Sequence, residues 1–244
     1  MRNLKLEIEY DGTDTCGWQA QKNAQKKSIQ ETIEKTLQKI LQEKIRLIAS
    51  GRTDAGVHSL GQTANFKTHS AIGLKKLQLA LNSLLPQDIA ISRIKEAHPD
   101  FHSRFSARAK IYRYIILNRA TRSPFLTNRA YFYPYPLDVQ LMRKHAKSLF
   151  GRHDFKSFCA SGSSVKDTVC IVKRITIKSP SLIIIDIEAD GFLYNMVRNI
   201  VGTLIEIGRG RPGFDIKEIL RSKDRRLAGP TAPARGLYLV KVRY

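Results

Sequence analysis

The stretch Gly51-Arg52-Thr53-Asp54-Ala55-Gly56-Val57-His58 joins two strand-like runs at residues 45–49 and 62–67. Glycine tolerates backbone angles that other residues resist, so the two glycines allow a sharp bend that presents Asp54 outward. Asp and Gly are also ordinary turn residues, and composition alone favours an Asp in a turn beside a chance Arg. The functional interpretation depends on the rest of the chain, which supplies basic and aromatic partners for such an acid.

The runs around this stretch predict a first α+β half. Apolar or aromatic residues at positions 4, 6, 8 and 10 alternate with charged ones, which predicts a half-buried strand. Ser28 and Glu31 form a capping box, and apolar residues follow at helical spacing up to Leu41. A second helix is expected over residues 72–85, where Pro86 ends it, and a strand is expected over residues 88–94.

The second half shows the same order of elements. Its expected elements are a strand at 110–117, a helix at 138–150, a strand pair at 170–178 and 181–189, a largely apolar helix at 192–207, a short helix near 214–222 and a strand at 237–242. The repeated order of strand, helix, strand pair, helix and strand predicts an α+β fold class. We expect two ferredoxin-like or RRM-like halves, residues 1–104 and 105–244, with antiparallel sheets side by side, helices on one face and an RNA cleft on the other.

The amino-acid totals favour a polyanionic partner. Lys and Arg number 42 and Asp and Glu 21 among 244 residues, so the formal charge is +21. Such a charge opposes compaction, and nucleic acid is the first expected partner, with an anionic membrane surface second. No run approaches the roughly 20 apolar residues that span a bilayer, and residues 1–10 do not form a secretory signal. Three cysteines without a C-x-x-C pair fit a reducing cytoplasm.

Basic residues are interleaved with aromatic ones between residues 102 and 135. Cations neutralise phosphates, and aromatic faces stack on unpaired bases, so the set as a whole predicts RNA binding. Any single arginine in it would more often be a solvated surface residue. The only tryptophan, Trp18, is expected to pack a loop onto the core rather than to stack on a base. The candidate RNA-contacting cations are Lys22, Arg104, Arg108, Arg113, Arg209 and Arg211.

Two apparent motifs are rejected on their context. Residues 208–213 match G-x-G-x-x-G, but they follow a helix, and Pro212 prevents the helix start that a dinucleotide site needs. His98 and His102 have the spacing of a zinc helix, but Pro99 breaks that helix and no Cys or acidic cluster completes the site. We therefore expect no metal, and without a Walker A sequence we expect no nucleotide hydrolysis.

Asp54 and Arg198 are candidates for an ion pair. Arg52, two residues from Asp54, favours the ionised carboxylate that a nucleophile or general base requires. Arg198 lies in the apolar helix, and if it is buried it needs an anionic partner such as Asp54. Alternatively, Arg198 faces solvent or pairs with Glu206 on the same polar stripe of the helix.

The sequence resembles the TruA family of tRNA pseudouridine synthases. The 51–58 loop carries the most specific part of the resemblance, and five further stretches follow in the same order and at the same spacing. These are Glu9-Tyr10-Asp11-Gly12 with Gly17-Trp18-Gln19, then the stretches 100–107, 112–114, 196–202 and 231–239. Cys16, where the family usually has an aromatic residue, and Ser59 are small departures that do not touch the proposed chemistry.

The resemblance implies a cofactor-free isomerase that converts uridine to pseudouridine at positions 38, 39 and 40 in the anticodon stem-loop of tRNA. It also implies a cytoplasmic homodimer in which one tRNA contacts both subunits. Within the matching stretches, Asp54 corresponds to the catalytic aspartate and Arg198 to its partner. Tyr112 corresponds to the aromatic residue that packs against the target uracil, and Arg52 to an RNA-contacting residue.

Two other functions remain as alternatives. An RNA chaperone with the same basic sheet and no chemistry would keep all its activity in an Asp54→Asn variant. An aspartate-dependent glycoside or RNA hydrolase would ordinarily need a second carboxylate, and the Asp54 loop offers none, although folding could bring Glu188 or Asp190 near.

Overall fold

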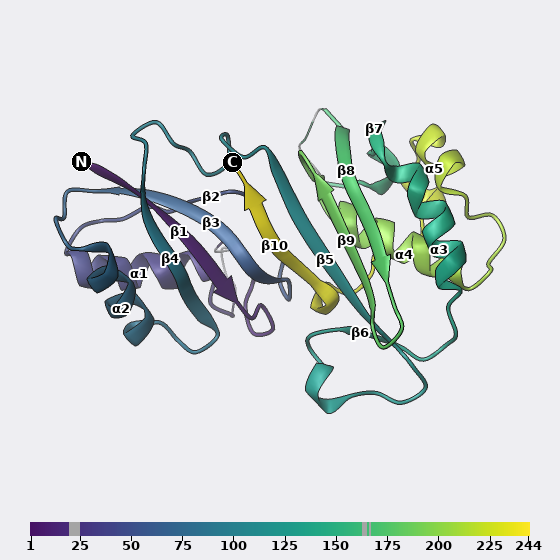
Figure 1. Ribbon diagram of the computed structural model, residues 1–244, viewed down its shortest axis with the longest axis horizontal. Coiled ribbons are helices and arrows are strands. Elements are labelled where there is room, and N and C mark those ends of the chain that lie inside the picture. Colours follow the sequence, from purple (N-terminus) through teal and green to yellow (C-terminus); the bar gives the residue numbers. More distant parts are fainter. Residues whose placement is uncertain (20–24, 163–164, 166) are drawn as a thin grey trace. The chain divides into compact units, whose positions relative to one another are not determined.

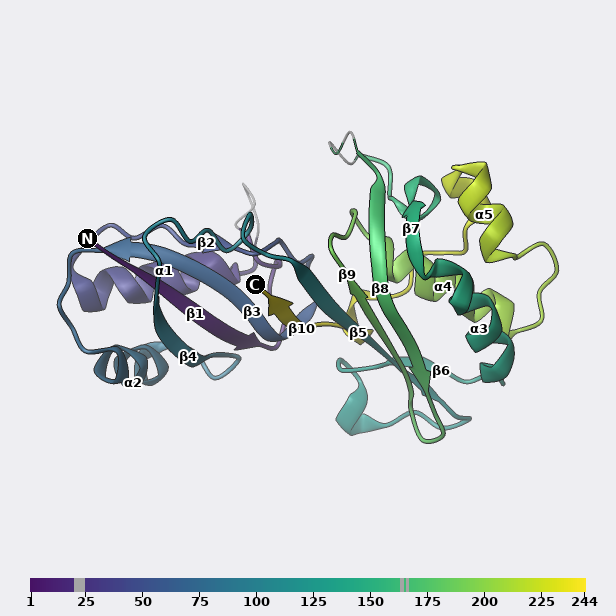
Figure 2. The same cartoon turned by 45° about the horizontal axis from the view of Figure 1, so that its top comes forward.

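The computed structural model describes residues 1–19, 25–162, 165 and 167–244, so Lys22 lies outside the described residues. Its ribbon is drawn in Figures 1 and 2. The chain forms two compact units, Met1–Arg108 with Tyr238–Tyr244, and Ala109–Leu237. The predicted halves, 1–104 and 105–244, differ from these units mainly at the C-terminus, since the last strand belongs with the first unit.

The first unit is built on a split β-α-β arrangement. Its elements are β1 (Arg2–Tyr10), α1 (Ile29–Leu41), β2 (Ile48–Ala49), β3 (His58–Thr68), α2 (Leu74–Leu84), β4 (Ile89–Ala97) and the returning β10 (Leu237–Arg243). Strand β1 is antiparallel to both β3 and β4, and β2 is antiparallel to β3, which is the strand order of a ferredoxin-like sheet.

The outer edge of β3 is shared by two strands. Strand β2 pairs with its later part, Ile48 opposite Asn65, while β10 runs parallel to its beginning, Tyr238 opposite His58. The Ser59 hydroxyl donates to the Leu239 carbonyl at 3.1 Å and holds this second pairing together. Ser59, which follows the 51–58 loop, is therefore held by β1 on one side of β3 and by β10 on the other.

Helix α1 forms where the sequence predicts it. The Ser28 hydroxyl accepts a hydrogen bond from the Glu31 N–H at 3.2 Å, which satisfies one of the free donors at the helix start. The apolar stripe of α1 packs with that of α2 against the inward face of β1, and each fully buried Leu or Ile contributes about 1.5–3 kcal/mol. The fully buried members are Leu4, Leu6, Ile8, Ile29, Ile33, Leu37, Leu77 and Leu81.

The second unit combines an antiparallel sheet with helices. Its strands are β5 (Ala109–Asn118), β6 (Tyr131–Tyr133), β7 (Gly151–Asp154), β8 (Val169–Lys178) and β9 (Ile183–Ala189). Its α-helices are α3 (Val139–Ala146), α4 (Met196–Gly208) and α5 (Ile216–Ser222). Short 3-10 turns occur at Pro124–Leu126, Lys147–Leu149, Lys156–Phe158, Arg225–Leu227 and Ala234–Gly236. The strand order is β5-β9-β8-β7, all antiparallel, with β6 parallel to β5.

Several predicted boundaries in this unit were wrong for local reasons. Helix α4 begins at Met196 instead of 192, because Asn195 adopts a left-handed backbone angle, φ 58°, just before it. The helix predicted over 138–150 ends at Ala146 and continues as a 3-10 turn. The prediction of a loop over most of 152–169 missed β7, a short polar edge strand. The α+β class with mainly antiparallel sheets is confirmed.

Within the described ranges, no helix is long and apolar enough to cross a membrane. The described residues also contain no group of three or more His, Cys, Asp or Glu side chains that could hold a metal ion.

Candidate active site

The Asp54 carboxyl group stands on a tight turn. The Val57 N–H donates to the Asp54 carbonyl at 3.2 Å, and Gly56, the third residue of this turn, has φ 78°. A positive φ at that position is the geometry of a type II turn, which a glycine adopts without strain. Asp54 is half-buried, Arg52 is exposed, and Asp54 is the only acid between residues 45 and 67. The turn therefore fixes the backbone position of the single acid in this stretch.

Thr53, directly before Asp54, is anchored twice. The Trp18 N–H donates to the Thr53 carbonyl at 2.9 Å, and the Thr53 hydroxyl lies 2.7 Å from the Tyr10 hydroxyl in a buried hydrogen bond. Burial raises the pKa of Tyr10 to about 12, so this hydroxyl keeps its proton over the ordinary working range. Trp18 is 2% exposed, which confirms its predicted role in packing.

Gly17 allows the first loop to approach the turn closely. A Cβ at Gly17 would lie 2.5 Å from the Thr53 carbonyl oxygen and 2.9 Å from the Asp54 carbonyl carbon. Gly17 also has φ 95°, a conformation that other residues rarely adopt. Only glycine fits between the 11–17 loop and the backbone of the catalytic candidate.

His58 closes the far end of the turn. The Gly12 N–H donates to His58 Nδ1 at 3.1 Å, and the imidazole stacks on Tyr238 with centroids 4.7 Å apart. Asp11 Oδ1 lies 3.2 Å from the same nitrogen, but an Nδ1 that accepts a backbone proton has none to donate to a carboxylate. The backbone bond therefore orients the ring, and Asp11 accepts from the Thr13 N–H and hydroxyl at 3.0 and 2.5 Å.

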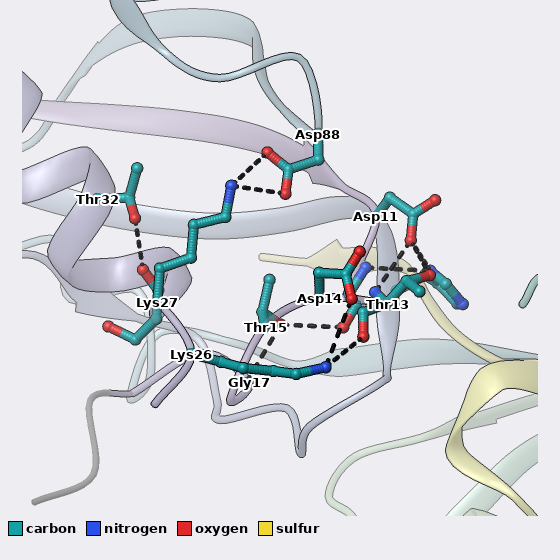
Figure 3. Close-up of polar contacts among 12 residues, drawn as sticks. Asp11, Thr13, Asp14, Thr15, Gly17, Lys26, Lys27, Thr32 and Asp88 are labelled. Carbon is teal, nitrogen blue, oxygen red and sulfur yellow. Dashed lines mark hydrogen bonds and ion pairs between the residues drawn. The ribbon is translucent and has the colours of Figure 1, made fainter. Parts of the chain in front are cut away.

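Figure 3 shows how the 11–17 loop is itself held. The Lys27 ammonium lies 2.8 Å from an Asp88 carboxylate oxygen, and Lys26 reaches Asp14 at 3.4 Å. The Asp11 N–H donates to the Asp88 carbonyl at 2.9 Å. These contacts join the loop to the start of α1 and the start of β4, so the support under Asp54 is continuous with the sheet.

Tyr10→Phe should loosen the backbone that carries Asp54, because Thr53, the residue before it, loses the hydroxyl that holds it in place. We expect a loss of stability of about 0.5–1.5 kcal/mol, as for one buried hydrogen bond. The effect should be independent of pH between 6 and 9, since Tyr10 stays protonated there. A double-mutant cycle with Thr53→Val checks this, and fully additive losses would contradict a shared role.

Tyr112 and Arg198 lie in the second unit. Tyr112 sits on β5 opposite Ile187, is 9% exposed and meets the ring of Phe192 edge-on at 4.9 Å. Arg198 is half-buried in the first turn of α4; its Nε donates to the Ala232 carbonyl at 2.7 Å and its Nη1 to Asn195 Oδ1 at 2.9 Å. These bonds fix the direction of the guanidinium. The predicted pairing of Asp54 with Arg198 stays a prediction.

Glu206, the alternative partner for Arg198, is engaged elsewhere. It is 5% exposed, and its carboxylate lies 2.9 Å from Arg211 and 3.5 Å from Arg209. Both arginines are candidate RNA contacts from the 208–213 turn. They share one buried carboxylate, which neutralises part of their charge.

The other candidate RNA contacts differ in their surroundings. Arg113 forms a bidentate ion pair with Asp186: its Nε and Nη2 donate to the two carboxylate oxygens at 2.8 and 2.9 Å. Its guanidinium therefore already has a carboxylate partner. The Arg108 N–H donates to the Arg243 carbonyl at 2.8 Å, and its side chain is exposed. Arg104 is exposed beside Phe105. Their contacts with RNA stay predictions.

Sequence reasoning missed the supports of the turn. Gly17 was noticed only as part of a matching stretch, while Tyr10 and Tyr238 were placed on predicted strands. None of the three was predicted to support the Asp54 turn. Tyr10 and Tyr238 are contacts across long sequence separations, which a single sequence does not reveal. A loop glycine such as Gly17 signals a turn or a close backbone approach, but the sequence does not show which segment approaches it.

The arrangement can position one carboxylate for attack or for proton removal. A turn that is hydrogen-bonded to residues 10, 12 and 18 through its backbone and side chains loses little entropy when a substrate binds, so the backbone that carries the carboxylate is preorganised. A single carboxylate can act as a nucleophile toward an electrophilic carbon or as a general base.

Comparisons with known proteins agree on one family. The sequence profile of the family described as "tRNA pseudouridine synthase" matches residues 7–106 and 145–244. Proteins named tRNA pseudouridine synthase A from Thermoanaerobacter pseudethanolicus and Caldicellulosiruptor bescii are each 50% identical to this chain over the full length of both chains. The protein of that name from Geobacillus kaustophilus is 44% identical over all of this chain and 95% of its own. A chain from a solved structure titled "Crystal Structure of a Cbf5-Nop10-Gar1 Complex" has 11% identity and a TM-score of 0.35 over 83% of this chain and 54% of its own, which is too low to support any conclusion.

Proposed function

Because this chain belongs to the tRNA pseudouridine synthase family, we propose that it isomerises uridine to pseudouridine at positions 38, 39 and 40 of the tRNA anticodon stem-loop, with Asp54 as the catalytic carboxylate. The observation that carries the proposal is the Asp54 turn, in which the bonds of Thr53, Val57 and His58 fix the backbone that carries one carboxylate. The net charge of +21 supports a polyanionic substrate.

The reaction breaks one bond and forms another without oxidation or phosphate transfer. The N1–C1′ glycosidic bond breaks, the uracil turns, C5 bonds to C1′, and the proton on C5 is lost to a base while N1 gains one. Asp54 either attacks C1′ or removes the proton from C2′, and both routes need one ionised carboxylate. Neither route requires a metal or a nucleotide cofactor.

In this proposal Tyr112 binds the uracil of the target uridine, and Arg198 binds the Asp54 carboxylate. The target uridine must leave its stack, and the flat face of Tyr112 would hold the detached base as it turns. Arg198, oriented by Ala232 and Asn195, would hold Asp54 ionised and in place. Arg52, exposed beside Asp54, would contact the RNA. We also infer a cytoplasmic homodimer in which one tRNA contacts both subunits, and analytical ultracentrifugation with and without tRNA tests the dimer.

Arg198→Ala is expected to lower turnover about tenfold or more while RNA affinity changes little. The guanidinium acts on a catalytic carboxylate, and a charged hydrogen bond contributes about 1.5–3 kcal/mol. Arg198→Lys should recover only part of the loss, because an ammonium group cannot reproduce the fixed fork of donors. Single-turnover kinetics and filter binding separate the two effects, and a loss of affinity with normal turnover would contradict this role.

The function is tested by tritium release from tRNA transcribed with 5-tritiated uridine. Four transcripts are compared: three with uridine at only one of positions 38, 39 and 40, and one with cytidine at all three. The proposal is supported if each of the three single-uridine transcripts releases more tritium than the all-cytidine transcript does. Binding without release would indicate a chaperone, and free uracil or cleaved RNA would indicate a hydrolase.

A further inference from the structure

The segment between β4 and β5 is tied to the sheet by buried amides. Asn3 Nδ2 donates to the carbonyls of His98 and Phe101 at 2.9 and 3.0 Å. Asn65 Oδ1 accepts from both the N–H and the hydroxyl of Ser103, at 2.9 and 2.8 Å. Asn3, Asn65 and Ser103 are 4%, 2% and 0% exposed, so the segment has a rigid base.

Beyond Ser103 the chain forms a closed turn. The His102 N–H donates to the Ser106 hydroxyl at 3.2 Å, and the Ser106 N–H donates back to the His102 carbonyl at 2.9 Å. His102 Nδ1 accepts from the N–H groups of Arg104 and Phe105, at 3.2 and 3.3 Å. The turn satisfies its own backbone groups, so it holds its shape without covering neighbours.

An exposed aromatic pair stands on this turn. The rings of His102 and Phe105 are stacked, with centroids 4.3 Å apart and planes 29° from parallel. Phe105 is nevertheless 77% exposed, and the Arg104 guanidinium lies 5.8 Å from its ring centre. We call residues 102–105 the aromatic tip. It combines a preformed flat surface with a cation, which are the two features that bind unpaired nucleic acid.

We propose that the aromatic tip stacks on an unpaired base of the RNA substrate, with Arg104 contacting an adjacent phosphate. A chain of charge +21 favours a polyanion over a neutral protein surface. The proposal rests on the proposed function for the identity of the RNA as tRNA.

The stacked base is not the uridine that reacts. Ser103 is bound to Asn65 on β3, whereas the Asp54 turn leads into His58 at the start of the same strand. Along β3, seven residues separate His58 from Asn65, which is about 24 Å in a fully extended strand. We therefore assign the base at the tip to a second nucleotide of the substrate.

The first test compares Phe105→Leu with the wild type in binding a tRNA transcript. Loss of one stacked base should weaken binding about 5- to 150-fold without changing its salt dependence. Arg104→Ala should reduce the salt slope by about one, as for one lost phosphate contact. Phe150→Leu, at a 62% exposed phenylalanine outside the 102–135 stretch, is the matched control and should bind as the wild type does.

The second test places a fluorescent ring at the tip. Phe105→Trp should keep the affinity, and its emission should be quenched by the transcript but not by fully paired duplex RNA. The native Trp18 gives a steady background, because it is 2% exposed. Quenching by the transcript alone supports stacking on an unpaired base.

Several outcomes would overturn the inference. Wild-type affinity of Phe105→Leu for the transcript would do so. An equal loss of affinity for fully paired duplex RNA would also do so, as would a Phe105→Leu variant that ultracentrifugation shows to have dissociated from a dimer into monomers. Thermal unfolding controls for folding and should be unchanged in Phe105→Leu, whose ring is on the surface. Tritium release by the wild type separates this inference from the proposed function. If the wild type releases tritium and Phe105→Leu binds the transcript normally, only the role of the aromatic tip is refuted. If the wild type releases no tritium, the proposed function is refuted.

Discussion

Asp54→Asn should reduce tritium release from 5-tritiated tRNA by on the order of 10³-fold or more, with RNA affinity within about twofold of the wild type. The amide fits the same turn, because the carbonyl that accepts from Val57 belongs to the backbone. It cannot attack C1′ or remove the C2′ proton. The fold should be unaffected, so the loss would report the chemistry.

Asp100→Asn is the matched control for this variant. It makes the same chemical change at a side chain that is 91% exposed and outside the turn. Both variants lose one negative charge, so any general effect on RNA binding appears in both. Full activity in Asp54→Asn would remove the carboxylate from the mechanism and favour the chaperone interpretation.

The second large effect is expected from Gly17→Ala, far from Asp54 in sequence. The new methyl group would meet the Thr53 carbonyl oxygen at 2.5 Å, and alanine would have to adopt φ 95°. Strain and overpacking together should cost about 2–4 kcal/mol of stability. Because the clash pushes on the backbone of Thr53 and Asp54, turnover should fall about 100-fold, as for a catalytic group displaced by about 1 Å.

Gly162→Ala separates the effect of backbone strain from the effect of the clash with Thr53. Gly162 has φ 84°, but a Cβ there would meet no atom within 4 Å. The Gly162→Ala variant should lose only the stability that the positive φ costs an alanine, about 1–2 kcal/mol, and its turnover should be unchanged. Thermal unfolding and tritium release of both variants make the comparison. Equal turnover in the two variants would show that the 11–17 loop does not position Asp54.

The elements with a strong local period were predictable. Alternation in residues 4–10 predicted β1, and Ser28 with the stripe up to Leu41 predicted α1, because burial on one face fixes the period. Strand β7 was missed because it is a polar edge strand of four residues, Gly151–Asp154. The start of α4 was misplaced because apolar residues continue before Asn195, and asparagine, although enriched at left-handed angles, adopts them in only a minority of cases.

The candidate site was predictable in its chemistry and not in its supports. Asp54 could be found because an acid between two turn glycines is a local pattern. The Tyr10 hydroxyl and the Tyr238 ring lie on β1 and β10, and only strand pairing brings them to the turn. Likewise, the partner of Glu206 could not be assigned, because Arg211 reaches it from beyond the end of α4.

The place of β10 in the first unit has a consequence for synthesis on the ribosome. The first unit includes Met1–Arg108 but also Tyr238–Tyr244, which are translated only after the whole second unit. At about 5–20 residues per second, β3 waits on the order of ten seconds for the strand that pairs with its beginning. Until then His58 lacks the ring of Tyr238, so the nascent first unit carries the Asp54 turn without its last support. A ribosome-bound chain that ends before residue 238 should therefore show a turn more open to proteolysis than that of the released protein.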